Sequence, residues 1–133
     1  MSQLTNVEIV RSAIDALNRD DIDAAMRLGD PQVEVDWSRS RGLIPGIHRG
    51  LEAARAFWSS LYETFESVTV FPEEYIEHGQ HVLVPNRTRF RGRDGIEVDT
   101  RSTVVVTLRD GLILRWVLFQ ERQDALEAMG LAE

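Results

Sequence analysis

The sequence predicts an α+β fold in which helices come first and a sheet of antiparallel strands follows. Apolar residues recur at helical spacing over residues 5–28 and again over 51–65. From residue 68 onward, apolar and polar residues alternate, and the turns between these runs carry dipeptides typical of hairpins. Helices separated along the chain from a hairpin-connected sheet indicate a curved sheet with helices on one face.

The whole chain, residues 1–133, is expected to be one domain. Its length is the usual size of a single domain, and it contains no repeat, linker or low-complexity tract. The chain has no cysteine, which excludes disulfides and thiolate nucleophiles. All 15 basic residues are arginine, so Schiff-base chemistry and a P-loop, which both need lysine, are excluded as well.

The charge and the apolar runs exclude several other classes. A net charge of −7 disfavours binding to nucleic acid or to an anionic membrane. No apolar run approaches the roughly 18 residues of a membrane span, and the N-terminus carries no signal peptide. We therefore expect a soluble, cytoplasmic protein that uses neither nucleic acid nor membrane as a partner.

The first two helices are predicted from their ends. Thr5, followed three residues later by Glu8, forms a capping box at the start of the first helix, which runs to about residue 17. Asp20 or Asp21 caps the second, which ends at Gly29. A third helix spans residues 51–65 with a wide apolar face, and a last one covers about 122–129.

The strands are predicted from alternation. Residues 33–37 form the first strand, and the segment 38–50, rich in Gly, Pro and Ser, is a long loop of the kind that serves as a lid or binding loop. The later strands are expected at residues 68–77, 81–91, 96–109 and 112–121.

Charges suggest the register of one hairpin. A three-residue loop over residues 93–95 would set the pairs Arg91–Glu97, Arg89–Asp99 and Arg87–Arg101. The first two join opposite charges across the ladder, whereas the third is unfavourable unless a carboxylate lies nearby. A two-residue turn would shift the pairing by one and remove these pairs.

Asp36 and His48 are the candidate catalytic residues. At the end of a strand and facing an apolar cavity, Asp36 would be desolvated, which would raise its pKa toward the range of a general base. Strand alternation instead puts Asp36 on the face opposite Trp37, so a solvated strand end is the alternative. His48, in the long loop, could act as acid or base, or it could pack its ring against the start of the third helix.

Five further residues are candidates for ligand binding. The aromatic residues Trp37, Trp58, Tyr62 and Trp116 either fill the core or line a pocket for a flat apolar ligand. Asn86 shares strand parity with apolar neighbours, so its amide binds either a ligand or the protein itself.

Two other features have structural explanations. His78 and His81 bracket a turn without completing a metal-ligand set, so no metal and no cofactor is expected. The arginines at residues 87–93 alternate onto one strand face, which indicates a charged outer sheet surface or a dimer interface.

Four segments carry a resemblance that covers nearly the whole chain. They are ALNRDDIDAAMRL, DPQVEVDW, PGIHRGLEAARAFW and VVVTLRDGLILRWVLFQERQDALEAMG. Together they resemble the SnoaL-like family of the NTF2-like superfamily, whose relatives include ketosteroid isomerase and polyketide cyclases. The resemblance implies a cone, in which a strongly bent sheet wraps around a long helix and leaves a pocket between them. It also implies homodimers packed through the outer sheet face.

The ketosteroid isomerase pattern fits only in part. Its general base falls on Asp36 or on Trp37, its tyrosine donor near Ala13, and its protonated aspartate on Thr103 or Val104. An alanine donates no hydrogen bond, and one such donor stabilises the transition state by about 3–4 kcal/mol. Steroid isomerase activity is therefore rejected.

Two functions remain open. The first is a cofactor-independent acid–base enzyme, a cyclase, isomerase, dehydratase or hydrolase, acting on a small apolar substrate with Asp36 as base. The second is a non-catalytic domain that binds a metabolite or associates with another protein. The resemblance alone does not choose between them, because this superfamily hosts many activities.

Overall fold

The first two helices begin at the capping residues expected for them. The computed structural model describes residues 4–40 and 46–130. Helix α1 (Asn6–Asn18) starts with the expected capping box, in which the Glu8 backbone N–H donates to the Thr5 hydroxyl and the Thr5 N–H donates to the Glu8 carboxylate. Asp21 caps α2 (Ile22–Met26) by accepting a hydrogen bond from the Ala24 N–H. Helices α3 (Leu51–Thr64) and α4 (Arg122–Ala128) confirm the other two predictions.

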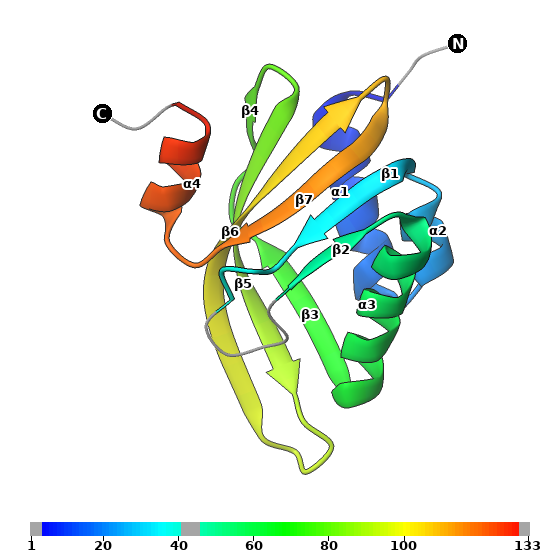
Figure 1. Ribbon diagram of the computed structural model, residues 1–133. Coiled ribbons are helices and arrows are strands. Elements are labelled where there is room, and N and C mark those ends of the chain that lie inside the picture. Colours follow the sequence, from blue (N-terminus) through cyan, green and yellow to red (C-terminus); the bar gives the residue numbers. More distant parts are fainter. Residues whose placement is uncertain (1–3, 41–45, 131–133) are drawn as a thin grey trace.

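The strands join in one sheet (Figure 1). Their bounds are β1 (Gly29–Asp36), β2 (Ile47–Arg49), β3 (Ser67–Pro72), β4 (Ile76–His78), β5 (His81–Arg91), β6 (Glu97–Arg109) and β7 (Leu112–Phe119). The order across the sheet is β2-β1-β7-β6-β5-β3, with β4 paired to the other end of β5. The sheet and the N-terminal helices together confirm the α+β class.

Three strand predictions need correction. The segment expected as a loop contains β2, which pairs with β1, and residues 41–45 of that segment lie outside the described residues. The single strand expected over 68–77 is divided into β3 and β4. Strand β1 begins at Gly29 rather than at residue 33, and its register with β7 shifts between Gly29 and Glu34.

The sheet is not wholly antiparallel, since β1 runs parallel to β7. In this pair Val35 lies opposite Trp116 and Asp36 lies opposite Val117. Local alternation predicts a strand but carries no information about its partner. The parallel direction of this pair is therefore set by the tertiary structure, in which β7 lies between β6 and β1.

Helices cover both faces of the sheet, which corrects the expectation of one covered face. Helices α1 and α3 pack on the face that we call the inner face, against a core that includes Val104, Val106 and Trp116. The second apolar cluster, which includes Val105 and Val117 together with Ala125 of α4, belongs to the opposite, outer face. Figure 1 shows α4 on the side of the sheet away from α1 and α3.

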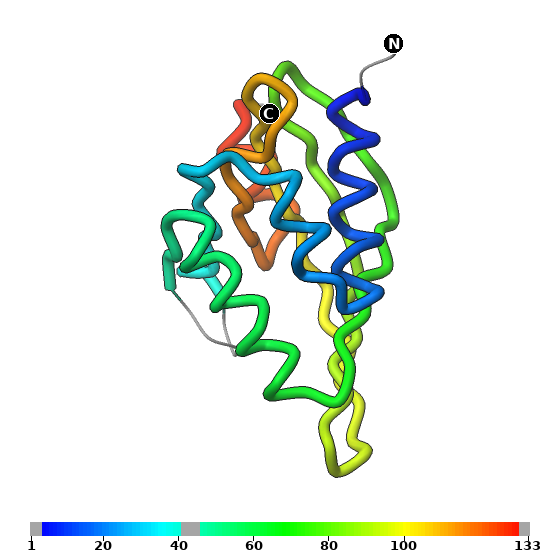
Figure 2. The backbone as a smooth tube through the Cα atoms, turned by 90° about the vertical axis from the view of Figure 1, so that its right-hand side faces the viewer, coloured from blue at the N-terminus to red at the C-terminus, as the bar shows by residue number. Residues whose placement is uncertain are grey.

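The β5–β6 hairpin has the predicted register. Strand β5 pairs with β6 through Arg91–Glu97, Arg89–Asp99 and Arg87–Arg101. The unfavourable arginine pair is relieved by carboxylates, because Arg87 lies 3.6 Å from Asp99 and Arg101 lies 3.2 Å from Glu73. The tip of this hairpin projects beyond the rest of the molecule (Figure 2).

Candidate functional site

A cavity of about 110 Å³ lies between the inner face of the sheet and helices α1 and α3. Its position follows from the strand parity of β5, β6 and β7, which turns alternate side chains toward the helices. The residues that line it are Ile14, Leu17, Trp37, Ser40, Trp58, Leu61, Tyr62, Val68, Val70, Val84, Asn86, Thr88, Phe90, Thr100, Ser102, Val104, Trp116, Leu118 and Gln120.

The chain has three tryptophans, and all of them line this cavity. Trp58 stands edge-to-face with Trp37, at 6.2 Å between ring centroids, and with Trp116, at 6.0 Å. The ring of Phe57 packs against Trp37, at 4.9 Å between ring centroids. The buried indole Nε1 of Trp37 has no hydrogen-bond partner within the described residues. These aromatic rings form a rigid apolar wall.

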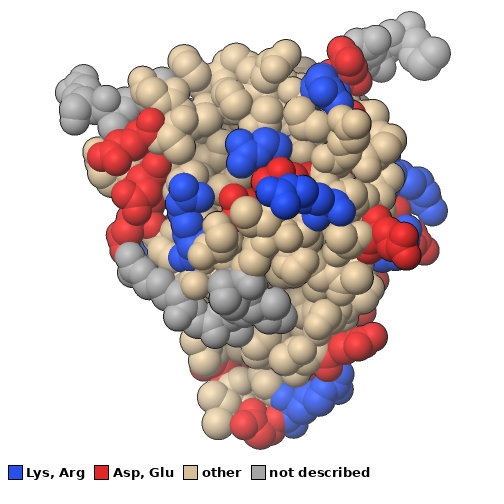
Figure 3. Space-filling view, in the orientation of Figure 1, with Lys and Arg blue, Asp and Glu red and all other residues tan. Residues whose placement is uncertain are grey.

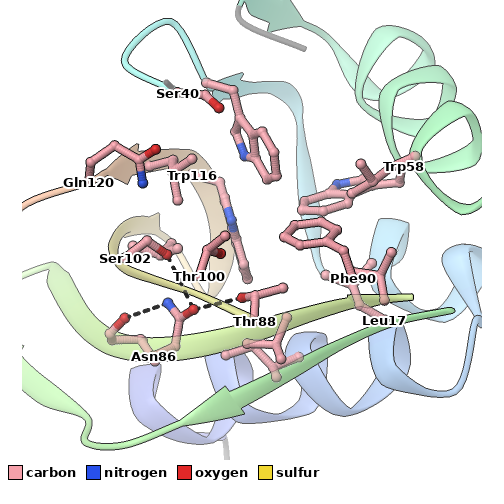
Figure 4. A pocket seen from close by; sticks show the side chains of 18 of the residues that line it. Leu17, Ser40, Trp58, Asn86, Thr88, Phe90, Thr100, Ser102, Trp116 and Gln120 are labelled. Carbon is pink, nitrogen blue, oxygen red and sulfur yellow. Dashed lines mark hydrogen bonds between the residues drawn. The ribbon is translucent and has the colours of Figure 1, made fainter. Parts of the chain in front are cut away.

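A second part of the cavity is polar but uncharged. Figure 4 shows Asn86, Thr88, Thr100, Ser102 and Gln120 on the side of the cavity away from Trp58. Asn86 is only 2% exposed, and its amide is hydrogen-bonded to both neighbouring hydroxyls. The cavity therefore combines an apolar wall with a neutral polar one.

Tyr62 contributes its ring to the cavity, while its hydroxyl holds two helices together. The hydroxyl of this α3 residue donates a 2.6 Å hydrogen bond to the Leu17 carbonyl near the end of α1. Burial, with a smaller effect from the charge of Asp20, raises the pKa of Tyr62 well above its usual value. The phenol therefore stays neutral at physiological pH.

Asp36 lies on the outer face beside Val117 and does not line the cavity, which corrects the expectation for the candidate base. It is not a solvated strand end either, since its side chain is only 7% exposed. The carboxylate accepts hydrogen bonds from the Ser38 N–H at 2.9 Å and the Ser38 hydroxyl at 2.6 Å. Burial raises the pKa of Asp36, but these hydrogen bonds and the charges of Arg39 and Arg115 outweigh that effect and leave the pKa below its ordinary value.

His48 also lies outside the cavity lining. It sits in β2, opposite Val35, and its ring packs on Phe57 of α3 at 4.6 Å. Its Nε2 is buried without a partner in the described part of the chain. The structure thus brings together Trp37, Trp58, Tyr62, Asn86 and Trp116, and it separates them from Asp36 and His48.

Thr88 and Ser102 line the cavity but were not predicted from the sequence, although a signal for both was present. Thr88 has the same parity on β5 as Asn86. The predicted hairpin register, extended by one residue, places Ser102 directly opposite Asn86. Parity and register together would have named the three residues as one group.

The other histidines have local roles. His78 and His81 face each other across β4 and β5, and the His81 Nδ1 lies 2.8 Å from the Thr107 hydroxyl. Across residues 4–40 and 46–130, no three histidine, cysteine or acidic side chains come together as a metal site would require.

The molecular surface mixes both signs of charge. Figure 3 shows both basic and acidic side chains on one face of the molecule. Glu34, for example, lies 3.6 Å from Arg49 and 3.9 Å from Arg115. Among the described helices, none has the length and apolar character needed to cross a membrane.

Comparisons with solved structures show where this architecture occurs. An NTF2-like protein of unknown function from Burkholderia pseudomallei has 19% identity and a TM-score of 0.78, with 96% of this chain and 97% of that chain covered. TerC co-crystallised with polyporic acid has 19% identity and a TM-score of 0.77, with 95% and 96% covered. A protein with a ketosteroid isomerase-like fold from Catenulispora acidiphila, in complex with trimethylamine, has 16% identity and a TM-score of 0.77, with 96% and 95% covered.

At these identities the likeness concerns the fold. No curated protein matches this chain. The model of the SnoaL-like domain family, however, matches residues 10–116, which include the long helix and most of the sheet. The family match leads to one conclusion: this chain has the NTF2-like fold and belongs to the SnoaL-like domain family.

Proposed function

We propose that this chain is a binding protein for a small, neutral, largely apolar molecule, which it holds in the cavity between the sheet and α3. One observation carries the proposal. Among the described residues that line the cavity, none is an aspartate, glutamate, histidine, lysine or arginine. Acid–base catalysis needs a group that exchanges a proton near neutral pH, and only the neutral phenol of Tyr62 titrates here at all.

The chemistry of the lining also supports the kind of ligand. Ligand pockets are mainly apolar, with a few polar groups that set orientation, and this cavity has that composition. At about 110 Å³ the cavity is smaller than an apolar cavity of about 150 Å³ that holds benzene, so the proposed ligand has at most a single ring. The neighbours crystallised with polyporic acid and with trimethylamine indicate that this fold can hold small molecules.

Acetophenone and benzoate test the proposal as a planar pair of similar size that differs in charge. By calorimetry we expect acetophenone to bind with a Kd of about 0.1–1 mM. Benzoate should bind at least about 100-fold more weakly, because burying an unpaired carboxylate is costly. Tryptophan fluorescence should report the same event, since every tryptophan lines the cavity.

Two variants of β6 locate the site. Val104→Phe places a larger side chain in the cavity and should abolish acetophenone binding. Val98→Phe makes the same change on the same strand at a position that is 53% exposed, and it should leave binding intact. Equal binding of benzoate, or full affinity in Val104→Phe, would contradict the proposal. The homodimer expected from the family resemblance stays a prediction, which sedimentation would test.

A further inference from the structure

Three buried polar side chains on the inner face form one hydrogen-bonded group. The Asn86 amide nitrogen donates to the Val84 carbonyl at 3.0 Å. Its amide oxygen lies 2.9 Å from the Thr88 hydroxyl and 3.3 Å from the Ser102 hydroxyl. Asn86 is 2% exposed, and Thr88 and Ser102 are each 9% exposed. We call Thr88 and Ser102 the hydroxyl pair.

The orientation of the Asn86 amide follows from its surroundings. The Val84 carbonyl can only accept a hydrogen bond, so the amide nitrogen must face it. The amide oxygen therefore faces the hydroxyl pair, and it can only accept. Each hydroxyl carries one proton, and both protons are directed at Asn86. The oxygen atoms of the hydroxyl pair are left with lone pairs alone.

The hydroxyl pair borders the cavity, on the side away from Trp58. Both residues line it, and Figure 4 shows them across the cavity from Trp58. A ligand that reaches them meets hydrogen-bond acceptors. A cationic donor such as an ammonium group would be buried without a carboxylate, because the described lining contains none. A hydroxyl group satisfies both conditions, because it donates a hydrogen bond and carries no charge.

We infer that the ligand of this cavity is an alcohol or phenol whose hydroxyl donates to Thr88 or Ser102, with Asn86 as the positioning residue that turns both hydroxyls into acceptors. The inference rests on the proposed binding function and adds the chemical class of the ligand. The inference places the hydrogen-bond-donating end of the ligand at the hydroxyl pair and its apolar ring against the apolar wall.

The test compares p-cresol with 4-fluorotoluene, which has similar size and shape but cannot donate a hydrogen bond. The readout is the ratio of their Kd values, measured by calorimetry on the intact chain. Thr88→Val combined with Ser102→Ala removes both acceptors with little change in shape. We expect this double variant to lower the preference for p-cresol about tenfold, which is the effect of one buried hydrogen bond. Each single variant should lower it by part of that amount.

Thr69→Val is the matched control. Thr69 of β3 pairs with Arg89 of β5 and does not line the cavity. The same chemical change at this position should therefore leave the ratio of Kd values as in the wild type. Because the ratio is taken within each variant, a modest loss of stability does not affect it, and near-ultraviolet circular dichroism verifies folding.

The outcomes are separable. A preference that falls in the double variant and persists in Thr69→Val supports the inference. Binding of both compounds with an unchanged ratio in the double variant overturns the inference and leaves the proposed function standing. Failure of the wild type to bind any of the three compounds, p-cresol, 4-fluorotoluene and acetophenone, overturns the proposed function and the inference with it.

Discussion

Asp36 and Trp37 are neighbours in the chain but lie on opposite faces of the sheet, and this parity decides what the cavity contains. Trp37 lines the cavity, whereas Asp36 lies on the outer face beside Val117. The ketosteroid isomerase pattern places its general base at one of these two positions, and the one turned inward here carries an indole. The buried carboxylate instead holds the segment after β1 in place by accepting a hydrogen bond from the Ser38 N–H. The next residue, Arg39, stacks over the ring of Phe119 at 4.9 Å.

Asp36→Asn tests this structural role. We expect the free energy of unfolding to fall by about 2 kcal/mol at pH 7, because the two hydrogen bonds from Ser38 lose their charged acceptor and the attraction to Arg39 and Arg115 is lost. The folded-state pKa of Asp36 is lowered, so its stabilisation is present above the unfolded pKa of about 3.9 and is lost as pH falls through the folded value. The difference in the free energy of unfolding between wild type and variant, measured by urea denaturation, should therefore narrow from pH 5 to pH 3.

The exposed Glu77 supplies the control for that series. Its replacement, Glu77→Gln, should leave stability close to that of the wild type throughout. A gap for Asp36→Asn that stays constant or widens at low pH would refute the role assigned to the carboxylate.

The β5–β6 hairpin is the element whose details the sequence predicted best. Its charge pairs are local in sequence, and a three-residue loop leaves one register for them. Gly95 is the residue that permits this loop, since its φ of +87° lies in the left-handed region. The Gly95 N–H closes the turn with a hydrogen bond to the Gly92 carbonyl at 3.0 Å.

Gly95→Ala should destabilise the protein by about 1 kcal/mol through the backbone alone. An added Cβ would meet nothing within 4 Å, so a steric clash does not contribute. Gly95→Asn is the matched variant, and we expect a smaller loss because asparagine tolerates the left-handed region better. Equal losses of stability for Ala and Asn in urea denaturation would contradict the role assigned to the positive φ of this residue.

At the scale of the whole molecule, two helices and the inner face of the sheet enclose a site that is polar on one side and uncharged among its described residues. This has a direct consequence for pH dependence. The Kd of acetophenone should change less than about twofold between pH 5.5 and 8.5, because burial keeps the phenol of Tyr62 neutral and the ligand does not titrate. A sigmoidal change in calorimetric titrations across this range would reveal a titrating group that faces the ligand.

The sequence alone determined the helices, most strands and the hairpin register. These depend on local signals, namely capping residues, periodicity, turn glycines and charge pairs, all of which act over a few residues. It also named Trp37, Trp58, Tyr62, Asn86 and Trp116 as candidates for a pocket that they do line.

Only the tertiary structure decided that β1 pairs in parallel with β7, that α4 covers the outer face, and that Asp36 and His48 lie outside the cavity. Alternation within a strand gives two faces but does not say which one meets the helices. That choice is made by partners far away in the chain, such as Trp116 beside Val35 and Val117 beside Asp36. The identity of the inward residue, and with it the chemistry of the site, is therefore a property of the assembled sheet.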